Sequence, residues 1–304
     1  MSIVEGRHSR LPSDITRLGL EEYVLQLEVD GLAVVPPEVH GVTEDRIDRL
    51  ASLLLERAEE LVGCRFDIND GPQADIEFPV PDHILAELAG EDSPGEPSQF
   101  LIQRLCTLDR SFRDLAVNPV AVALMRYLLG SRAVRFSSHN GFVKWPGDYG
   151  YGPNLGLHCD QLAVPLPWGR NALTANTNWC LTEYTHQGGA LAFVPGSHRR
   201  MSPPVFPDAV ERAVPCAVPK GSLIVFHGAT WHGAYPKHTP GMRLMISNYY
   251  RHLMVLPQEE FRNNFDPGLA DDCDDPATFR TLCGYTDDFP YVQQSERVPR
   301  VVAG

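Results

Sequence analysis

Short apolar runs follow one another between residues 133 and 250, and their spacing is the strongest constraint on the fold. The runs are AVRFSSHNGFVKW, LGLHCDQLAV, TANTNWCLTEY, ALAFVPGSH, SLIVFHG and MRLMISNYY. Glycine, proline or polar turn residues separate them, which is typical of the strands of a sandwich or jelly roll rather than of alternating strand and helix units. We therefore predict a mainly β, jelly-roll core over about residues 131–255, with a helical layer covering one face of its sheet.

The part of the chain before this core, residues 14–130, is predicted to be rich in helices. In TEDRIDRLASLLLERAEELVG, apolar residues recur at steps of three and four, Thr43 stands at the N-cap position and Gly63 follows the last turn. A second helix is predicted over about 98–116. A third begins at NPVAVALMRYLLG, where Asn118 can cap the first turn. Ahead of all three, GLAVVPP predicts a short strand.

Loops rich in proline, glycine and acids are predicted at residues 64–82 and 90–98. The C-terminal segment 256–304 is expected to be a loop-rich tail, and its acidic stretch DPGLADDCDDP at 266–276 is expected to lie in solvent. Because no Ser/Gly-rich or charge-block linker interrupts the sequence, we expect residues 1–304 to form one domain.

The composition favours a cytoplasmic protein that acts on a small molecule. A formal net charge of -13 disfavours nucleic acid as a partner, because phosphate binding needs clustered Lys and Arg. The N-terminal segment mixes charges into every turn, unlike a secretory signal, and no apolar run approaches the ~20 residues that span a bilayer. The 7 cysteines form no Cys-x-x-Cys pair, which predicts reduced thiols. A monomer and a homodimer both remain open.

One of the predicted strands carries two candidate metal ligands. In LGLHCDQLAV, His158 and Asp160 are separated by one residue, so both side chains would point to the same face of a strand. A third donor must come from elsewhere, and the stretch VFHGATWHGAYPKHTPGMRLMISNYYRH offers histidines at 227, 232, 238 and 252. Two histidines and one carboxylate on one face form the facial triad of non-haem Fe(II) oxygenases, which leaves positions open for dioxygen and a co-substrate.

An isolated arginine in the last predicted strand indicates what the co-substrate would be. Arg243 stands in MRLMISNYY, and a guanidinium stays charged and offers a planar fork that pairs with a carboxylate. 2-Oxoglutarate would chelate iron through its keto-acid end and leave such a carboxylate to be held inside the protein. Ser247 lies four residues further on, on the same strand face, and could add a hydroxyl donor.

The sequence resembles the phytanoyl-CoA dioxygenase-like branch of the Fe(II)/2-oxoglutarate oxygenases in HCD, in GGALAFVPGSHR and in FHGATWHGAYPKHTPGMR. The resemblance covers about residues 20–255 and implies a double-stranded β-helix. It also implies that His158, Asp160 and His232 bind iron and that Arg243 anchors 2-oxoglutarate.

Several nearby positions leave alternatives or depart from the family. His227 could replace His232 as the third ligand, and His198 in PGSHRR is expected at a turn or behind the ligands. Gln187 precedes two glycines where relatives often carry Asn-Gly, and Ala234 stands where they often have a serine that touches the co-substrate.

The remaining site predictions concern the co-substrate and the substrate pocket. Lys144, in GFVKWPG, stands where relatives often place a basic or polar contact to the co-substrate. The residues expected to line the substrate pocket are His139, Asn140, Tyr149, Tyr151, Gln161, Asn178 and Trp179.

The expected activity is hydroxylation, or another oxidation, of an unactivated C–H bond in a small and apolar metabolite. Fe(II) and O2 would act with 2-oxoglutarate, which is converted to succinate and CO2, and no catalytic side chain is expected beyond the metal ligands. The carboxylate of Asp160 argues against halogenation, because halogenating relatives have a small residue there. The alternatives are a cupin-like metalloenzyme that does not use 2-oxoglutarate and a non-catalytic binding protein with the same fold.

Overall fold

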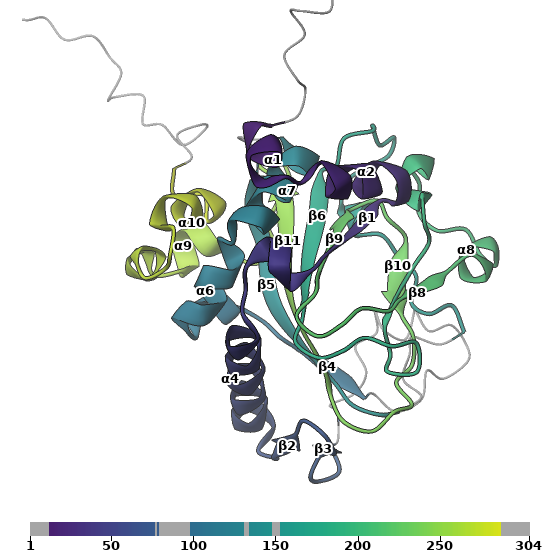
Figure 1. Ribbon diagram of the computed structural model, residues 1–304, viewed down its shortest axis with the longest axis vertical. Helices are drawn as coiled ribbons and strands as arrows, with labels where there is room; N and C mark the ends of the chain where they lie inside the picture. The colour runs from purple at the N-terminus through teal and green to yellow at the C-terminus, as the bar shows by residue number, and fades with distance from the viewer. Residues whose placement is uncertain (1–11, 77, 79–97, 131–133, 148–152, 287–304) are drawn as a thin grey trace, which may run out of the picture.

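The computed structural model describes residues 12–76, 78, 98–130, 134–147 and 153–286. It shows two antiparallel sheets that face each other, with most of the helices packed on the outer face of the larger sheet (Figure 1). This arrangement confirms the predicted mainly β jelly roll with helical cover. None of the described helices is long and apolar enough to cross a membrane.

The larger sheet has six strands in the order β1-β9-β6-β11-β5-β4, and each neighbouring pair is antiparallel. Its strands are β1 (Leu32–Val35), β4 (Gln99–Ile102), β5 (Val134–Lys144), β6 (Thr174–Cys180), β9 (Leu223–His227) and β11 (Arg243–His252). The smaller sheet has the order β10-β7-β8, formed by β7 (Leu191–Phe193), β8 (Val214–Cys216) and β10 (His232–Ala234). Strands from distant parts of the chain therefore lie side by side.

The described helices are mostly short. They are α1 (Ser13–Leu18), α2 (Glu21–Asp30), α3 (Pro37–His40), α4 (Glu44–Val62), α6 (Arg110–Ala116), α7 (Pro119–Leu129), α8 (Asp208–Glu211), α9 (Phe261–Asn264) and α10 (Pro276–Leu282). Single 3-10 turns are η1 (Leu105–Thr107), η2 (Asp160–Ala163), η3 (Ser197–Arg200) and η4 (Pro267–Asp271). Among the described segments, α4 and α7 are the clearest examples of helices that the sequence pattern predicts.

The predicted helix ends are confirmed at α7 and α4. The Asn118 side chain accepts hydrogen bonds from the amides of Val120 and Ala121, at 3.1 and 3.2 Å, and so caps the first turn of α7. Gly63 ends α4 with a φ of 74°, in the left-handed region that glycine adopts without strain. Thr43 stands at the N-cap of α4 but makes no side-chain capping bond.

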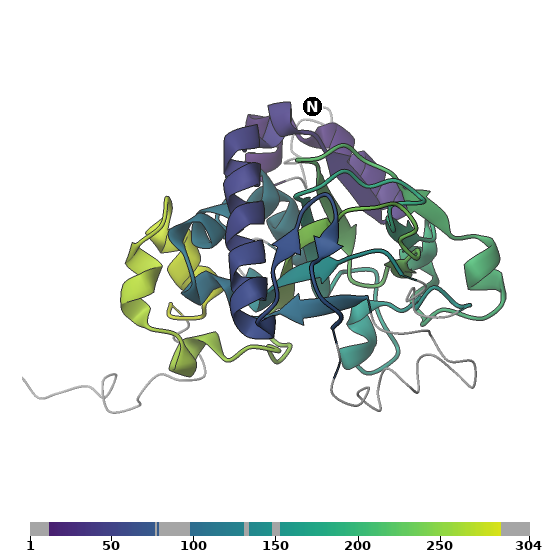
Figure 2. The same ribbon diagram turned by 90° about the horizontal axis from the view of Figure 1, so that it is seen from below.

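Helix α4 crosses the outer face of the larger sheet, as Figure 2 shows. The helix buries one apolar stripe that includes Leu50 and Leu54. Leu54 packs where β5 has Gly141, and a Cβ atom at residue 141 would lie only 2.2 Å from a Leu54 methyl carbon. The helix therefore sits this close to β5 because residue 141 has no side chain.

The predicted helix over 98–116 is wrong in its first half. Gln99–Ile102 forms the edge strand β4, which pairs with β5, and the helix α6 begins only at Arg110. The Asp109 side chain accepts a hydrogen bond from the amide of Ser111 at 2.7 Å, so the cap that starts α6 lies well inside the predicted range. Pairing with β5 satisfies the backbone of 99–102 and overrides its helix propensity.

Two stretches predicted as loops also differ in part. Residues 64–76 contain a small hairpin of β2 (Phe66–Asp67) and β3 (Gly71–Pro72). In the C-terminal segment, the described part up to residue 286 contains α9, η4 and α10 rather than loop alone.

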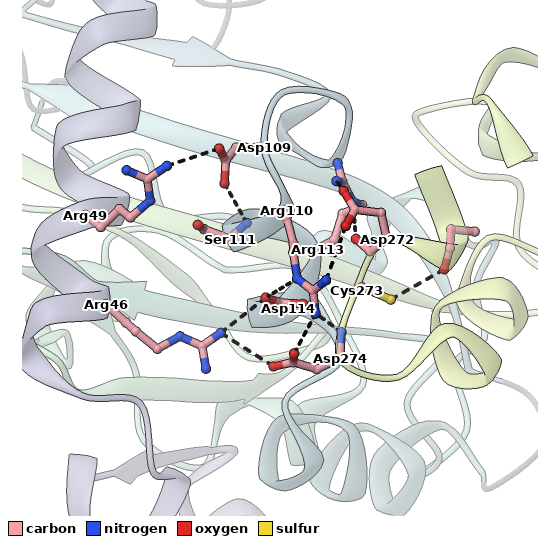
Figure 3. A network of polar contacts seen from close by, with 11 residues as sticks. Arg46, Arg49, Asp109, Arg110, Ser111, Arg113, Asp114, Asp272, Cys273 and Asp274 are labelled. Atoms are coloured by element: carbon pink, nitrogen blue, oxygen red, sulfur yellow. Dashed lines mark hydrogen bonds and ion pairs between the residues drawn. The ribbon is translucent and has the colours of Figure 1, made fainter. Parts of the chain in front are cut away.

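The aspartates of the acidic stretch at 266–276 are exposed, as predicted, but the stretch also docks on α6 (Figure 3). Arg113 on α6 is only 3% exposed at its side chain, and it donates to the carboxylate and the backbone oxygen of Asp272. Its third bond goes to the carbonyl of Cys106 at 2.9 Å. The neighbouring Arg110 pairs with Asp274 at 3.0 Å, but it is exposed. The buried arginine thus joins the C-terminal segment to the helical layer.

The first prediction concerns this junction. Replacement of Arg113 by alanine leaves backbone and side-chain acceptors without their charged donor, so we expect the free energy of unfolding to fall by about 2–3 kcal/mol. Arg110→Ala is the matched control, and its loss should be clearly smaller because water replaces an exposed ion pair. Urea unfolding of the two variants measures both. Equal losses would show that Arg113 is no more important than its exposed neighbour.

Candidate metal centre

Three side chains from two distant segments converge on one point. They are His158, Asp160 and His232, and their candidate ligand atoms all lie within 4.8 Å of one another. The Nε2 atom of His158 is 3.5 Å from Oδ1 of Asp160, and Nε2 of His232 is 3.6 Å from Oδ2 of Asp160. Two imidazoles and one carboxylate at this spacing match the donor set of a facial triad.

A small piece of backbone pairing brings the ligand candidates together. His158 and His232 form an isolated antiparallel bridge, in which each amide donates to the other residue's carbonyl at 2.8–2.9 Å. The predicted strand over LGLHCDQLAV is therefore wrong beyond this bridge, because Asp160 begins the 3-10 turn η2. The two side chains still meet, since the turn directs the carboxylate back toward the imidazoles.

The hydrogen bonds of both histidines leave the correct nitrogen free for a metal. Nδ1 of His158 is 2.8 Å from the carbonyl of Gly156, and Nδ1 of His232 is 2.9 Å from the carbonyl of Thr230. A carbonyl only accepts, so Nδ1 carries the hydrogen and Nε2 keeps its lone pair. Burial lowers the pKa of His232 to about 4, which keeps this imidazole neutral.

Two further residues hold Asp160 in place. The side-chain amide of Asn176 donates to Oδ2 of Asp160, and the hydroxyl of Tyr249 donates to the Asp160 backbone oxygen at 3.1 Å. Both residues lie on strands of the larger sheet. Such bonds orient a ligand before the metal arrives, so the residues present fit a divalent metal ion such as Fe(II).

His227 does not belong to this group. Its Nδ1 accepts a hydrogen bond from the Ala229 amide at 3.0 Å, and its ring lies 5.4 Å from that of His198. Both rings line a separate cavity of about 420 Å³. Of the two histidines that the sequence left open, the structure places His232 with His158 and Asp160.

A second feature of the site is a group of buried cations at the end of β5 and the start of β11. Arg243 and Lys144 are Cα partners on these strands, and Lys237 lies nearby. Their exposed fractions are 4, 0 and 3%. The Arg243 guanidinium donates to the Gly189 carbonyl at 2.8 Å, while its Nε has no partner.

These cations lack an anion among the residues that the structure describes. The Lys144 amino group donates to the Tyr235 carbonyl, and Lys237 donates to backbone and hydroxyl oxygens at 239 and 240. Burial and the neighbouring charges of Arg243 and Lys237 lower the pKa of Lys144 to about 6. Burial and the charge of Arg243 lower the pKa of Lys237 to about 8. An anionic ligand would relieve this repulsion.

A cavity of about 350 Å³ connects the histidine group with Arg243. Its wall includes Ser247 and, on either side of it, Asn140 and Asn178, which are both Cα partners of Ser247. Of the predicted pocket residues, Asn140 and Asn178 therefore line the cavity. Ala234 also lines it.

Other predicted pocket residues lie elsewhere. His139 directly precedes Asn140, and Trp179 directly follows Asn178. Because neighbours along a strand face opposite sides of the sheet, both residues point away from the cavity. His139 contacts the Cys106 thiol, and Trp179 packs against the His40 ring at 5.0 Å, both under the helices. Gln161 is buried and accepts from the Leu173 amide at 2.9 Å, outside the cavity lining.

Two further pocket predictions, Tyr149 and Tyr151, lie outside the described residues. Conversely, sequence reasoning missed Asn176, Tyr249 and Lys237. Asn176 could have been found, because it precedes Asn178 by two residues in TANTNW and so shares its strand face. Lys237 stands between turn residues in YPKHTP, where no periodicity marks it as buried.

Solved structures share this fold. The epimerase SnoN, described in complex with Fe3+, alpha ketoglutarate and nogalamycin RO, aligns with a TM-score of 0.54 at 17% identity over 80% of this chain and 88% of that one. HygX from Streptomyces hygroscopicus, with nickel and 2-oxoglutarate bound, aligns with a TM-score of 0.53 at 15% identity, over 77% of this chain and 88% of that one. At these identities the likeness shows the fold.

Sequence relatives match over different lengths. Dioxygenase af480 of Aspergillus fumigatus is 33% identical over 138 residues, which are 45% of this chain and 43% of that protein. This match thus spans less than half of the fungal protein. The uncharacterized protein Rv1501 of Mycobacterium tuberculosis is 23% identical over 208 residues, 68% of this chain and 75% of that protein. The sequence model of the phytanoyl-CoA dioxygenase (PhyH) family matches residues 29–245, most of the chain, so the protein belongs to this family.

Proposed function

We propose that this protein is an Fe(II)- and 2-oxoglutarate-dependent dioxygenase that oxidises a C–H bond of a small molecule, with hydroxylation as the leading outcome. The observation that carries the proposal is the pairing of two unlike features on one cavity. A metal-ligand group stands at one side, and Arg243, a buried cation without a carboxylate partner among the described residues, stands at the other. The SnoN and HygX structures, which hold a metal and the same keto acid, support it.

In this proposal His158, Asp160 and His232 hold Fe(II), and their hydrogen bonds keep Nε2 and the carboxylate directed at the ion. The bound iron supplies activation of O2, coupled to conversion of 2-oxoglutarate to succinate and CO2. Three protein ligands leave the remaining coordination positions for the keto acid and O2.

The protein's own contribution on the far side is recognition of the co-substrate. The Arg243 guanidinium is buried, has an unpartnered Nε and can offer its planar fork to the distal carboxylate of 2-oxoglutarate. The Ser247 hydroxyl lines the same cavity, four residues along the same strand face. Lys144 adds a second positive group beside Arg243 when it is protonated.

Apolar side chains shape the rest of the cavity and limit its water. Leu191, Phe226 and Met245 line it, and Ala234 contributes a methyl group where a hydroxyl could have touched the co-substrate. The co-substrate is therefore recognised mainly from the β11 and β5 side.

Two other functions fit the fold less well. A cupin-like metalloenzyme without 2-oxoglutarate would leave Arg243 and the buried lysines with no use, although burying cations is costly. A non-catalytic binding protein would have no need of the bonds that orient both histidines and the carboxylate. A cytoplasmic setting, and a monomer or homodimer, are the corresponding proposals for location and assembly.

The metal ligands can be tested by comparing two histidines. We expect His232→Ala to weaken Fe(II) binding at least about tenfold, because it removes one of three ligands. His227→Ala should bind Fe(II) like the wild type, since its ring faces the other cavity. Anaerobic calorimetric titration of both variants gives the dissociation constants. Loss of Fe(II) binding in the His227 variant alone would show that His227, and not His232, is the third ligand.

The co-substrate site has a spectroscopic test. Anaerobic protein with Fe(II) and 2-oxoglutarate should develop the weak visible charge-transfer band of the chelated keto acid. Arg243→Lys keeps the charge but loses the fork, so half-maximal band intensity should need about tenfold more 2-oxoglutarate. Arg199→Ala, at an exposed arginine, is the control. Iron binding without any band in the wild type would favour the cupin-like alternative.

Lys144 makes co-substrate binding depend on pH. Its pKa of about 6 means that the free site holds a neutral amine above pH 6, whereas a bound dianion favours the ammonium form. Binding then takes up a proton, so the affinity for 2-oxoglutarate should fall as the pH rises above about 6, by up to about tenfold per unit. Lys144→Met should flatten this dependence. A wild-type affinity that is constant between pH 6 and 8 would contradict the prediction.

A further inference from the structure

One row of side chains crosses the floor of the cavity on three adjacent strands. Ser247 on β11 lies between Asn140 on β5 and Asn178 on β6 in the strand register. Both asparagines are at least nine-tenths buried, and in each the side-chain oxygen Oδ1 has no hydrogen-bond partner. A buried acceptor left without a donor is costly, so a ligand in this cavity is expected to supply one.

The orientation of the Asn140 amide follows from a chain of hydrogen bonds. The Ser138 hydroxyl donates its single hydrogen to Oε1 of Gln258 at 2.9 Å. The Ser138 oxygen can then only accept, and it receives the Asn140 amide group at 2.9 Å. This bond uses the nitrogen side of the amide and leaves Oδ1 of Asn140 buried without a hydrogen-bond partner. The wall of the cavity thus contains a buried acceptor that lacks a donor.

The place of Asn140 along β5 sets it apart from Lys144, which ends this strand beside Arg243. The β6 side of the cavity serves the metal group, because Asn176 on β6 holds Asp160. Strand β11 carries Arg243, the proposed anchor of 2-oxoglutarate. On β5, Lys144 stands beside Arg243 at the end of the strand, so the inward face around Asn140 and Phe142 remains for the molecule to be oxidised.

An apolar wall stands beside this acceptor. Phe142 lies two residues along β5 from Asn140, and its Cα partner on the edge strand β4 is Leu101. Both side chains line the cavity, and Leu101 is 40% exposed. A ligand that binds here therefore meets a hydrogen-bond acceptor and a hydrocarbon surface within one strand pair.

We propose that Asn140, held by Ser138 and Gln258, is a specificity residue that accepts a hydrogen bond from a hydroxyl or amine group of the substrate. The substrate is accordingly a hydroxylated or aminated molecule with a hydrocarbon part against Phe142 and Leu101, which narrows the small apolar metabolite expected from the sequence. This inference rests on the proposed function, because it assigns the β5 side of the cavity by the place of the metal and 2-oxoglutarate.

The test compares two soluble probes of equal size. Cyclohexanol can donate a hydrogen bond, whereas cyclohexanone can only accept one. Saturation-transfer NMR on the full chain, loaded with Zn(II) and saturated with 2-oxoglutarate, gives the dissociation constant of each probe. We expect the wild type to bind cyclohexanol about fivefold more tightly, the ratio for one neutral hydrogen bond.

Three variants locate the preference. Asn140→Leu keeps the shape but removes the acceptor and should abolish the preference, whereas Asn140→Asp keeps an acceptor and should retain it. Asn248→Ser changes a buried asparagine on the opposite face of the sheet, where its strand partner is His139, and should leave the preference unchanged. Retention of the preference in Asn140→Leu would overturn the inference, and so would equal binding of the probes, tighter binding of the ketone or no binding of cyclohexanol to the wild type.

The same preparations separate this inference from the proposed function. The charge-transfer band with Fe(II) and 2-oxoglutarate reports the metal and co-substrate sites alone. A wild type that forms the band but shows no preference for the alcohol overturns only the role of Asn140. A wild type without the band overturns the proposed function as well, since the β5 side is then no longer assigned to a substrate.

Discussion

The two-sided pairing of β11 is the constraint on which the site depends. This strand pairs with β5 on one side and β6 on the other, so its inward residues define rows across the cavity. Arg243 and Ser247 belong to that inward set. Slipping β11 by one residue would turn both toward the helices and bring Leu244 and Ile246 into the cavity. The apolar contacts beneath the helical layer, which bury these two residues completely, therefore fix the polar chemistry on the other face.

The cavity holds unlike charges at its two sides, and this difference organises the proposed chemistry. Asp160 supplies the single carboxylate of the metal-ligand group, whereas Arg243 lines the other side and has two buried lysines near it. In the described part of the chain, the Asp160 carboxylate and the Arg243 guanidinium do not pair with each other. A bound metal ion neutralises the carboxylate, and a dianionic keto acid neutralises the cations. Because the two ligands carry opposite charges, each lowers the electrostatic free energy of binding the other. The neutral amides of Asn140 and Asn178 lie between these two charged sides of the cavity and are suited to bind an uncharged group.

Local patterns predicted some elements well and failed at others for identifiable reasons. Helix α7 carries its own start signal, and Asn118 caps it as expected. The failure at residues 99–102 has a nonlocal cause, because pairing with β5 makes that stretch a strand. The prediction puts His139 and Trp179 in the pocket together with Asn140 and Asn178, but only the two asparagines line it. Alternation along a strand separates these residues, but the sequence does not say which of the two faces is the cavity.

The sequence by itself determined the residue types of the site and the class of fold. His158, Asp160, His232 and Arg243 could all be named from it, because ligands and anchors need particular side chains and the apolar runs need a β core. Only the tertiary structure decided that His232 rather than His227 meets Asp160, that Lys237 joins the buried cations and that Asn140 presents a free oxygen. These facts depend on backbone pairing between distant segments, such as the bridge of His158 with His232, and no local pattern encodes that distance.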